Sequence, residues 1–90
     1  MNYHFISIGG AVMHNLALDI LAQGHTVTGS DDEIFDPALS RLKAHNIAPE
    51  KFGWFPENIT TNIDVIILGM HARADNPELQ RAKELGLTIY

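Results

Sequence analysis

Apolar residues in the first third of the chain change from a strand-like run to a helix-like spacing. Residues 3–8 are rich in aromatic and β-branched side chains and stop at two glycines, which predicts a strand near the centre of a sheet. We expect the next segment to be a helix that ends near Gln23, with Gly24 just beyond it. Its inner face is predicted by apolar residues at positions i, i+3, i+4, i+7 and i+8, namely Met13, Leu16, Ala17, Ile20 and Leu21.

Further strands are indicated along the rest of the chain. Residues 26–30 predict a short second strand, and residues 51–54 predict a third strand or an extended loop. Residues 64–69 form the clearest strand, because their unbroken apolar run is typical of a parallel strand buried on both faces. We expect residues 47–63 to be largely a surface connection. Residues 86–90 have the pattern of a strand that is just starting, so we expect the chain to be the N-terminal piece of a longer protein.

Two further helices are predicted from the residues that start them. Asp36 is a typical helix cap and Pro37 a typical first helical residue. Asp75 and Glu78 have the spacing of a capping box, and Pro77 fits the first turn of the helix that would follow. The helices therefore alternate with the strands.

The order β-α-β-α-β-β-α-β predicts an α/β fold, with a Rossmann-like parallel sheet of about five strands and helices on both faces. At 90 residues the chain is one domain, residues 1–90.

Composition narrows the classes of partner. The net charge of −5 argues against a nucleic-acid partner, which would favour a basic surface. The absence of cysteine excludes disulfides and thiolate metal sites. No apolar run approaches the roughly 20 residues that span a bilayer, and the N-terminus lacks a signal-peptide pattern. We therefore expect a soluble, cytoplasmic chain with no membrane partner.

The turn after the first strand is the first candidate site, because ligands of such folds bind at the carboxyl ends of the strands. Gly9 and Gly10 allow close approach of a ligand, and the free N–H groups of the following helix favour phosphate. Ser7 and Val12 stand where the dinucleotide fingerprint G-x-G-x-x-G has its outer glycines. Asp31 lies where a carboxylate bonds a ribose hydroxyl in dinucleotide folds. A turn that only connects two elements, and a solvated acidic loop at Asp31, are the alternatives.

Residues 4–17, HFISIGGAVMHNLA, resemble the opening of the Mur ligases that act on UDP-N-acetylmuramate, which is roughly H-F-x-G-I-G-G-x-G-M-x-x-x-A. Three further stretches follow in the family's order, at residues 29–31 (GSD), 56–58 (PEN) and 74–78 (ADNPE). The resemblance is to the branch that adds L-alanine or recycles a tripeptide. It implies a three-domain, ATP-dependent ligase of peptidoglycan precursors, in which the first domain binds the UDP part of the substrate.

The resemblance also implies the cofactors and partners. ATP and Mg²⁺ would bind the central domain through a P-loop, and no G-x-x-x-x-G-K-S/T occurs in this chain. The partners would be UDP-N-acetylmuramate and the central and C-terminal domains. This domain alone would bind substrate, hold no cofactor or metal, and contribute no catalytic residue.

Several residues are implied to contact the substrate. Backbone N–H groups of the glycine turn would face the diphosphate, and the end of the second strand would lie beside ribose and uracil. The residues after the 64–69 strand would form the opposite rim. The predicted site residues are Gly9, Gly10, Ala11, Val12, Ser30, Asp31, Trp54, His71, Ala72, Arg73 and Asn76.

Alternatives remain open for single residues and for the whole chain. Trp54 would stack on uracil or cover the sheet edge, Asn76 would contact ligand or cap a helix, and Arg73 would pair with phosphate or lie on the surface. We expect His14 to be a solvated helix residue, with a phosphate contact as the alternative. The competing functions are an NAD-binding domain of a dehydrogenase or regulatory protein, and a purely structural interaction module.

Overall fold

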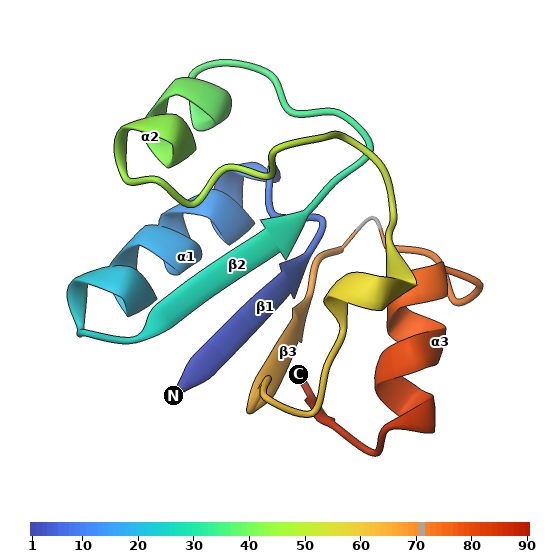
Figure 1. The fold of residues 1–90 in the computed structure, drawn as a ribbon. Coiled ribbons are helices and arrows are strands. Elements are labelled where there is room, and N and C mark those ends of the chain that lie inside the picture. The colour runs from blue at the N-terminus through green and yellow to red at the C-terminus, as the bar shows by residue number, and fades with distance from the viewer. Residues whose placement is uncertain (71) are drawn as a thin grey trace.

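The computed structural model describes residues 1–70 and 72–90, and its centre is a parallel β-sheet. The strands are β1 (Asn2–Ile6), β2 (Thr26–Ser30), β3 (Val65–Leu68) and β4 (Thr88–Ile89), in the order β2-β1-β3-β4 (Figure 1). All three neighbouring pairs are parallel. The predicted α/β sheet with a central first strand is confirmed, with four strands in the described residues and not about five.

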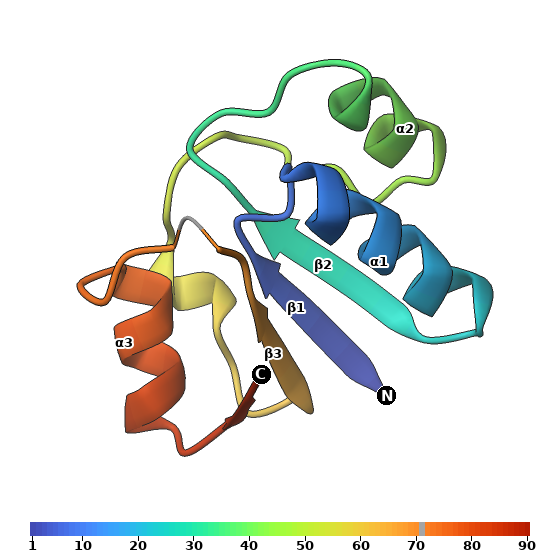
Figure 2. The same ribbon diagram turned by 180° about the vertical axis from the view of Figure 1, so that it is seen from behind.

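Helices cover both faces of the sheet, as predicted. Helices α1 (Ala11–Ala22) and α2 (Ala38–Ala44) lie on one face and α3 (Pro77–Glu84) on the other (Figures 1 and 2). A short 3-10 helix, η1 (Pro56–Asn58), packs beside α3. None of these helices is long and apolar enough to cross a membrane, and the statement covers residues 1–70 and 72–90.

Each face of the sheet has its own apolar core, because successive strand residues point to opposite faces. Phe5 of β1 packs with Ala17 of α1 and Leu42 of α2 in one cluster. The next residue, Ile6, belongs to the other cluster together with Leu79 of α3. Adjacent residues of one strand thus tie the two helical layers to the same sheet.

Of the two alternatives for residues 51–54, a strand or an extended loop, the strand is not formed and the segment is a loop. Gly53 alone pairs there, in an isolated antiparallel bridge with Asp31. Gly53 has a φ of +128°, which takes the backbone out of the extended conformation and ends the pairing. This is the physical reason for one strand fewer than expected.

The capping box predicted for Asp75 and Glu78 is wrong, whereas the alternative of Asn76 as a helix cap is confirmed. Asn76 caps this helix, because its side chain accepts hydrogen bonds from the N–H groups of Glu78 and Leu79 at 2.9 and 3.2 Å. Asp75 instead lies on the surface, with its carboxylate 3.4 Å from Arg73. Glu78 does not complete a capping box, since its carboxyl group is buried against β1.

Helix α2 also starts slightly later than predicted. Pro37 is its cap, and Ala38 its first helical residue. Asp36 keeps a capping role all the same, because its carboxylate accepts hydrogen bonds from the N–H and hydroxyl of Ser40 at 2.8 and 2.6 Å. The end of α1 matches expectation, with Gly24 at a φ of +94° just beyond it.

The predicted inner face of α1 is confirmed except at Leu16, since the first core cluster includes Ala17 and is contacted by Met13, Ile20 and Leu21. Leu16 is exposed, whereas His14 is buried. The ring of His14 lies between the Gly10 carbonyl, 3.0 Å from Nδ1, and the Arg41 guanidinium, 3.1 Å from Nε2. The expectation of a solvated His14 was therefore wrong, and its ring links the start of α1 to α2.

Candidate functional site

A pocket of about 490 Å³ opens at the carboxyl end of the sheet, beside the glycine turn. Four parts of the chain form it: the turn between β1 and α1, the end of β2, the segment before η1, and the end of β3. We call it the glycine-turn pocket, and it is lined by Ser7, Gly9, Gly10, Ala11, Val12, Met13, Asp31, Asp32, Glu33, Trp54 and Met70. The fold thus brings together six of the predicted site residues: Gly9, Gly10, Ala11, Val12, Asp31 and Trp54.

The backbone of the turn is bent at Ser7 and not at the glycines. Ser7 has a φ of +71°, and the N–H groups of Ser7 and Ile8 both donate to the carbonyl of Ser30, at 2.8 and 3.1 Å. Gly9 is required for space, because a Cβ there would lie 2.9 Å from both the Asp31 carboxylate and the Ile34 side chain. Gly10 has room, since the nearest atom to a Cβ would be 3.7 Å away.

The start of α1 supplies the N–H donors of the pocket. Gly10 is the cap residue, and within residues 1–70 and 72–90 no side chain caps the helix. The first turn contains no acidic residue. The N–H groups of a first helical turn have no intrahelical acceptors, and the helix dipole adds positive potential there. Ala11 and Val12 belong to this turn and line the pocket. This end of the pocket is therefore suited to an anion such as phosphate.

Asp31 adds an acidic group beside the glycine turn. Its carboxylate is largely buried and accepts hydrogen bonds from the N–H of Gly9 at 2.8 Å and of Asp32 at 2.9 Å. Burial raises the pKa of Asp31 above its ordinary value of 3.8, and the Gly9 N–H opposes that rise only in part. Of the four predicted N–H donors of the turn, that of Gly9 is thus already engaged.

The pocket therefore combines helix N–H groups, carboxylates and an aromatic side chain in its lining. The helix end attracts negative charge, whereas the carboxylates of Asp31, Asp32 and Glu33 accept hydrogen bonds from hydroxyl or amide groups. Trp54 is half-buried and packs partly against the second core cluster while also lining the pocket. A ligand that combines an anion with hydroxyl groups and a flat ring matches this arrangement.

The remaining predicted site residues lie elsewhere. Ser30 lines a different pocket, and Ala72 packs against the second core cluster. Arg73 is on the surface, with 83% of its side chain exposed, beside Asp75. Asn76 is buried and engaged as the α3 cap. His71 lies outside the described residues.

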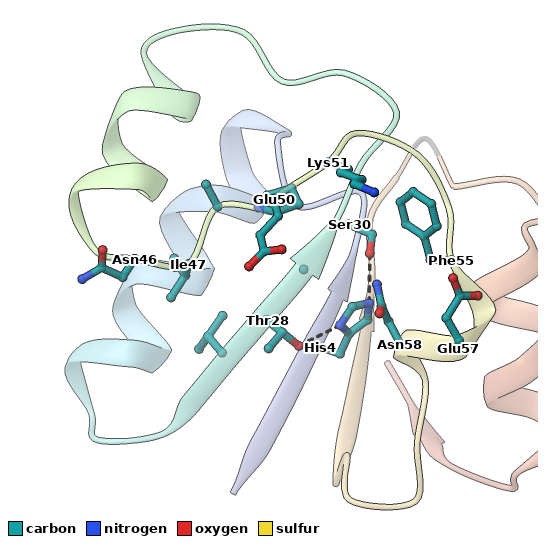
Figure 3. Close-up of a pocket in the computed structure, with 14 residues that line it drawn as sticks. His4, Thr28, Ser30, Asn46, Ile47, Glu50, Lys51, Phe55, Glu57 and Asn58 are labelled. Atoms are coloured by element: carbon teal, nitrogen blue, oxygen red, sulfur yellow. Dashed lines mark hydrogen bonds between the residues drawn. The ribbon is translucent and has the colours of Figure 1, made fainter.

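The second pocket, of about 590 Å³, lies along the free edge of β2 (Figure 3). We call it the β2-edge pocket; its floor includes His4, Thr28 and Ser30, and the segment before η1 borders it. The charged side chains that line it are the two acids Glu50 and Glu57 and one lysine, Lys51. Among the described residues, none of the three α-helices contributes its first turn to this pocket, and the only helix that borders it is the three-residue η1. The glycine-turn pocket is therefore the better anion site in spite of its smaller volume.

Some lining residues were missed at the sequence level. Met70 directly follows the 64–69 strand, and its place at a strand's carboxyl end was the available signal. Met13 was predicted to lie on the inner face of the helix. It also lines the pocket because it lies in the first turn of α1. Asp32 and Glu33 follow Asp31 directly and enlarge its acidic rim.

Comparison with known proteins identifies similar chains. Residues 2–90 match the Mur ligase family, catalytic domain. The UDP-N-acetylmuramate–L-alanine ligase of Sulfurihydrogenibium sp. is 38% identical over 84 residues, which cover 93% of this chain and 18% of that ligase. The chain thus spans about a fifth of the length of the curated relatives that it matches.

Solved structures of two related ligases share the fold. The murein peptide ligase of Psychrobacter arcticus superposes with a TM-score of 0.88 at 28% identity, covering 100% of this chain and 18% of that one. The UDP-N-acetylmuramate–alanine ligase of Thermotoga maritima gives a TM-score of 0.82 at 30% identity, covering 99% of this chain and 20% of that one.

Proposed function

This chain belongs to the Mur ligase family, and we propose that it is the domain that binds the UDP part of UDP-N-acetylmuramate in a peptidoglycan-precursor ligase. The observation that carries the proposal is the glycine-turn pocket, whose lining includes both the N-terminus of α1 and the buried carboxylate of Asp31. The family assignment argues against the alternative of an NAD-binding dehydrogenase domain.

Three kinds of group in the pocket have a proposed role in holding the substrate. The N-terminal N–H groups of α1, from Ala11 and Val12, bind the diphosphate. Asp31 accepts hydrogen bonds from ribose hydroxyls, as carboxylates at this position do in related folds. Trp54 offers a flat apolar surface to uracil, since a base stacks on an aromatic ring through its π-face.

Ser30 and the rim residues have weaker support. Ser30 lines the β2-edge pocket, so we propose that its carbonyl shapes the turn through Ser7 and that its hydroxyl does not contact the substrate. We assign no substrate contact to Arg73 or Asn76, because the Arg73 side chain is exposed beside Asp75 and the Asn76 side chain is engaged as the α3 cap.

We propose that the full-length ligase uses ATP and Mg²⁺ in a further domain. The 90 residues of this chain do not fit an ATP–Mg²⁺ site, since they include no P-loop sequence. Among residues 1–70 and 72–90, no three metal-ligating side chains of His, Cys, Asp or Glu gather in one place. The relatives include ligases for L-alanine and for murein peptide, so the added group is one of these two. We place the ligase in the cytoplasm, where nucleotide sugars and ATP are made.

Calorimetric titration tests the proposal directly. The 90-residue chain is titrated with UDP-N-acetylmuramate and, separately, with NAD. We expect binding of the UDP-sugar and none of NAD, and weaker UDP-sugar binding in Asp31→Ala. Glu57→Ala is the matched control, because it removes an acid from the β2-edge pocket and leaves the glycine-turn pocket intact. Binding of NAD alone would contradict the proposal, and binding of neither ligand would favour a structural module.

A further inference from the structure

A buried hydrogen-bonded pair, His4 and Glu78, joins three distant parts of the chain. His4 lies in β1 and Glu78 in the first turn of α3, and both side chains are almost fully buried, at 2% and 0% exposed. A hydrogen bond of 2.7 Å joins His4 Nε2 to Glu78 Oε1. The other ring nitrogen of His4 is 2.8 Å from the hydroxyl of Thr28 in β2, a contact drawn in Figure 3.

The second oxygen of Glu78 reaches the segment that carries Trp54. Glu78 Oε2 accepts a hydrogen bond from the backbone N–H of Phe55 at 2.9 Å. On the other side of Trp54, the N–H of Gly53 donates to the carbonyl of Asp31 at 2.8 Å. The two residues that flank Trp54 are therefore each tied to the body of the domain, one through the His4–Glu78 pair.

These bonds matter because the surrounding segment has little regular structure of its own. Between α2 and β3 the only helical or strand element in the described residues is the three-residue η1. Without tertiary anchors, such a segment samples many backbone conformations. The wall of the pocket at Trp54 is thus held by side chains that do not line the pocket.

We propose that His4 and Glu78 are positioning residues that hold Trp54 in the wall of the substrate pocket. The ligand side of this inference rests on the proposed function, whereas the positioning itself does not. The pair acts through the Phe55 N–H, so removing the Glu78 carboxyl group frees that N–H and lets Trp54 leave the wall. Neither residue needs to contact the substrate.

The single tryptophan of the chain makes the proposal measurable. Trp54 is the only source of tryptophan fluorescence in the 90 residues. In Glu78→Ala we expect acrylamide to quench Trp54 at least about twofold more strongly. We expect the affinity for UDP-N-acetylmuramate to fall about tenfold, in the range that a stacking aromatic contributes.

Two variants separate positioning from a general loss of stability. Glu78→Gln keeps an oxygen that can accept from Phe55 N–H and an amide that can donate to His4, so it should restore both wild-type readouts. Leu85→Ala removes apolar contacts from the same core cluster about 10 Å further along α3 and should leave Trp54 quenching unchanged. A folded Glu78→Ala chain with unchanged quenching would overturn the proposal, as would equal changes in Leu85→Ala.

Amide exchange in the wild-type chain supplies a test that survives if Glu78→Ala fails to fold. The N–H of Phe55 should exchange at least about tenfold more slowly than that of Phe52, for which no hydrogen bond is found within the described residues. Equal exchange at the two amides would overturn the proposal. Fluorescence and exchange need no ligand, so a chain that positions Trp54 but binds no UDP-sugar would count against the proposed function alone.

Discussion

Replacing Gly9 by alanine is expected to destabilise the domain, whereas the same change at Gly10 is not. At position 9 the new Cβ would lie 2.9 Å from the Asp31 carboxylate and from Ile34, both of which are buried. Overpacking of this kind costs about 1–3 kcal/mol. Displacement of Asp31 would also weaken its hydrogen bond with the Gly9 N–H.

At position 10 the effects of alanine on the helix cap and on the unfolded chain nearly cancel. The Cβ would meet nothing closer than 3.7 Å. Alanine is a poorer helix cap than glycine by up to about 1 kcal/mol. Against this, alanine restricts the unfolded chain, which stabilises the folded state by about 0.4–1 kcal/mol.

Urea denaturation followed by circular dichroism measures the difference. With a slope of about 1 kcal/mol per molar urea for a small domain, Gly9→Ala should lower the midpoint by about 2 M and Gly10→Ala by less than about 0.5 M. Both variants place a methyl group in the same turn, so they control for each other. Equal midpoints in the two variants, or a larger loss at Gly10, would refute the argument that Asp31 packs against Gly9.

Three further results are expected. Because burial raises the pKa of Asp31, its contribution to stability should fall as pH rises from about 3.8 through the raised pKa. The difference in unfolding free energy between wild type and Asp31→Asn should therefore change across that range, and a pH-independent difference would contradict the raised pKa. Asn76→Ala should cost about 1 kcal/mol in urea denaturation and Asp75→Ala close to nothing, with equal costs as the contrary result. Trp54→Ala should weaken UDP-N-acetylmuramate binding about tenfold by calorimetry and Trp54→Phe much less, unless Trp54 only covers the sheet edge.

The parts of the fold that the sequence predicts are those with a strong local pattern. The apolar run of β3 and the two glycines after β1 identify a parallel sheet and the turn at its carboxyl edge. The convergence of Gly9 and Asp31 on one pocket follows, because the parallel strands β1 and β2 end at the same edge. Trp54 reaches the pocket from the irregular segment before η1, which the strand pattern does not predict.

The missed features depend on single backbone angles or on distant partners. Asp75 and Asn76 are both good helix caps, and only the backbone geometry decides between them. The strand expected at residues 51–54 fails because of one positive φ, at Gly53. The pairing of His4 with Glu78 joins residues 74 positions apart, and a single sequence has no local signal for it.

The central claim is that the free N-terminus of α1 binds the diphosphate of UDP-N-acetylmuramate. Backbone amide resonances of the 90-residue chain, followed by NMR during titration with that substrate, test it most directly. We expect the largest shifts at Ala11 and Val12, together with the Trp54 indole N–H. Largest shifts at Thr28 and Lys51, which line the β2-edge pocket, or no saturable shifts at all, would contradict it.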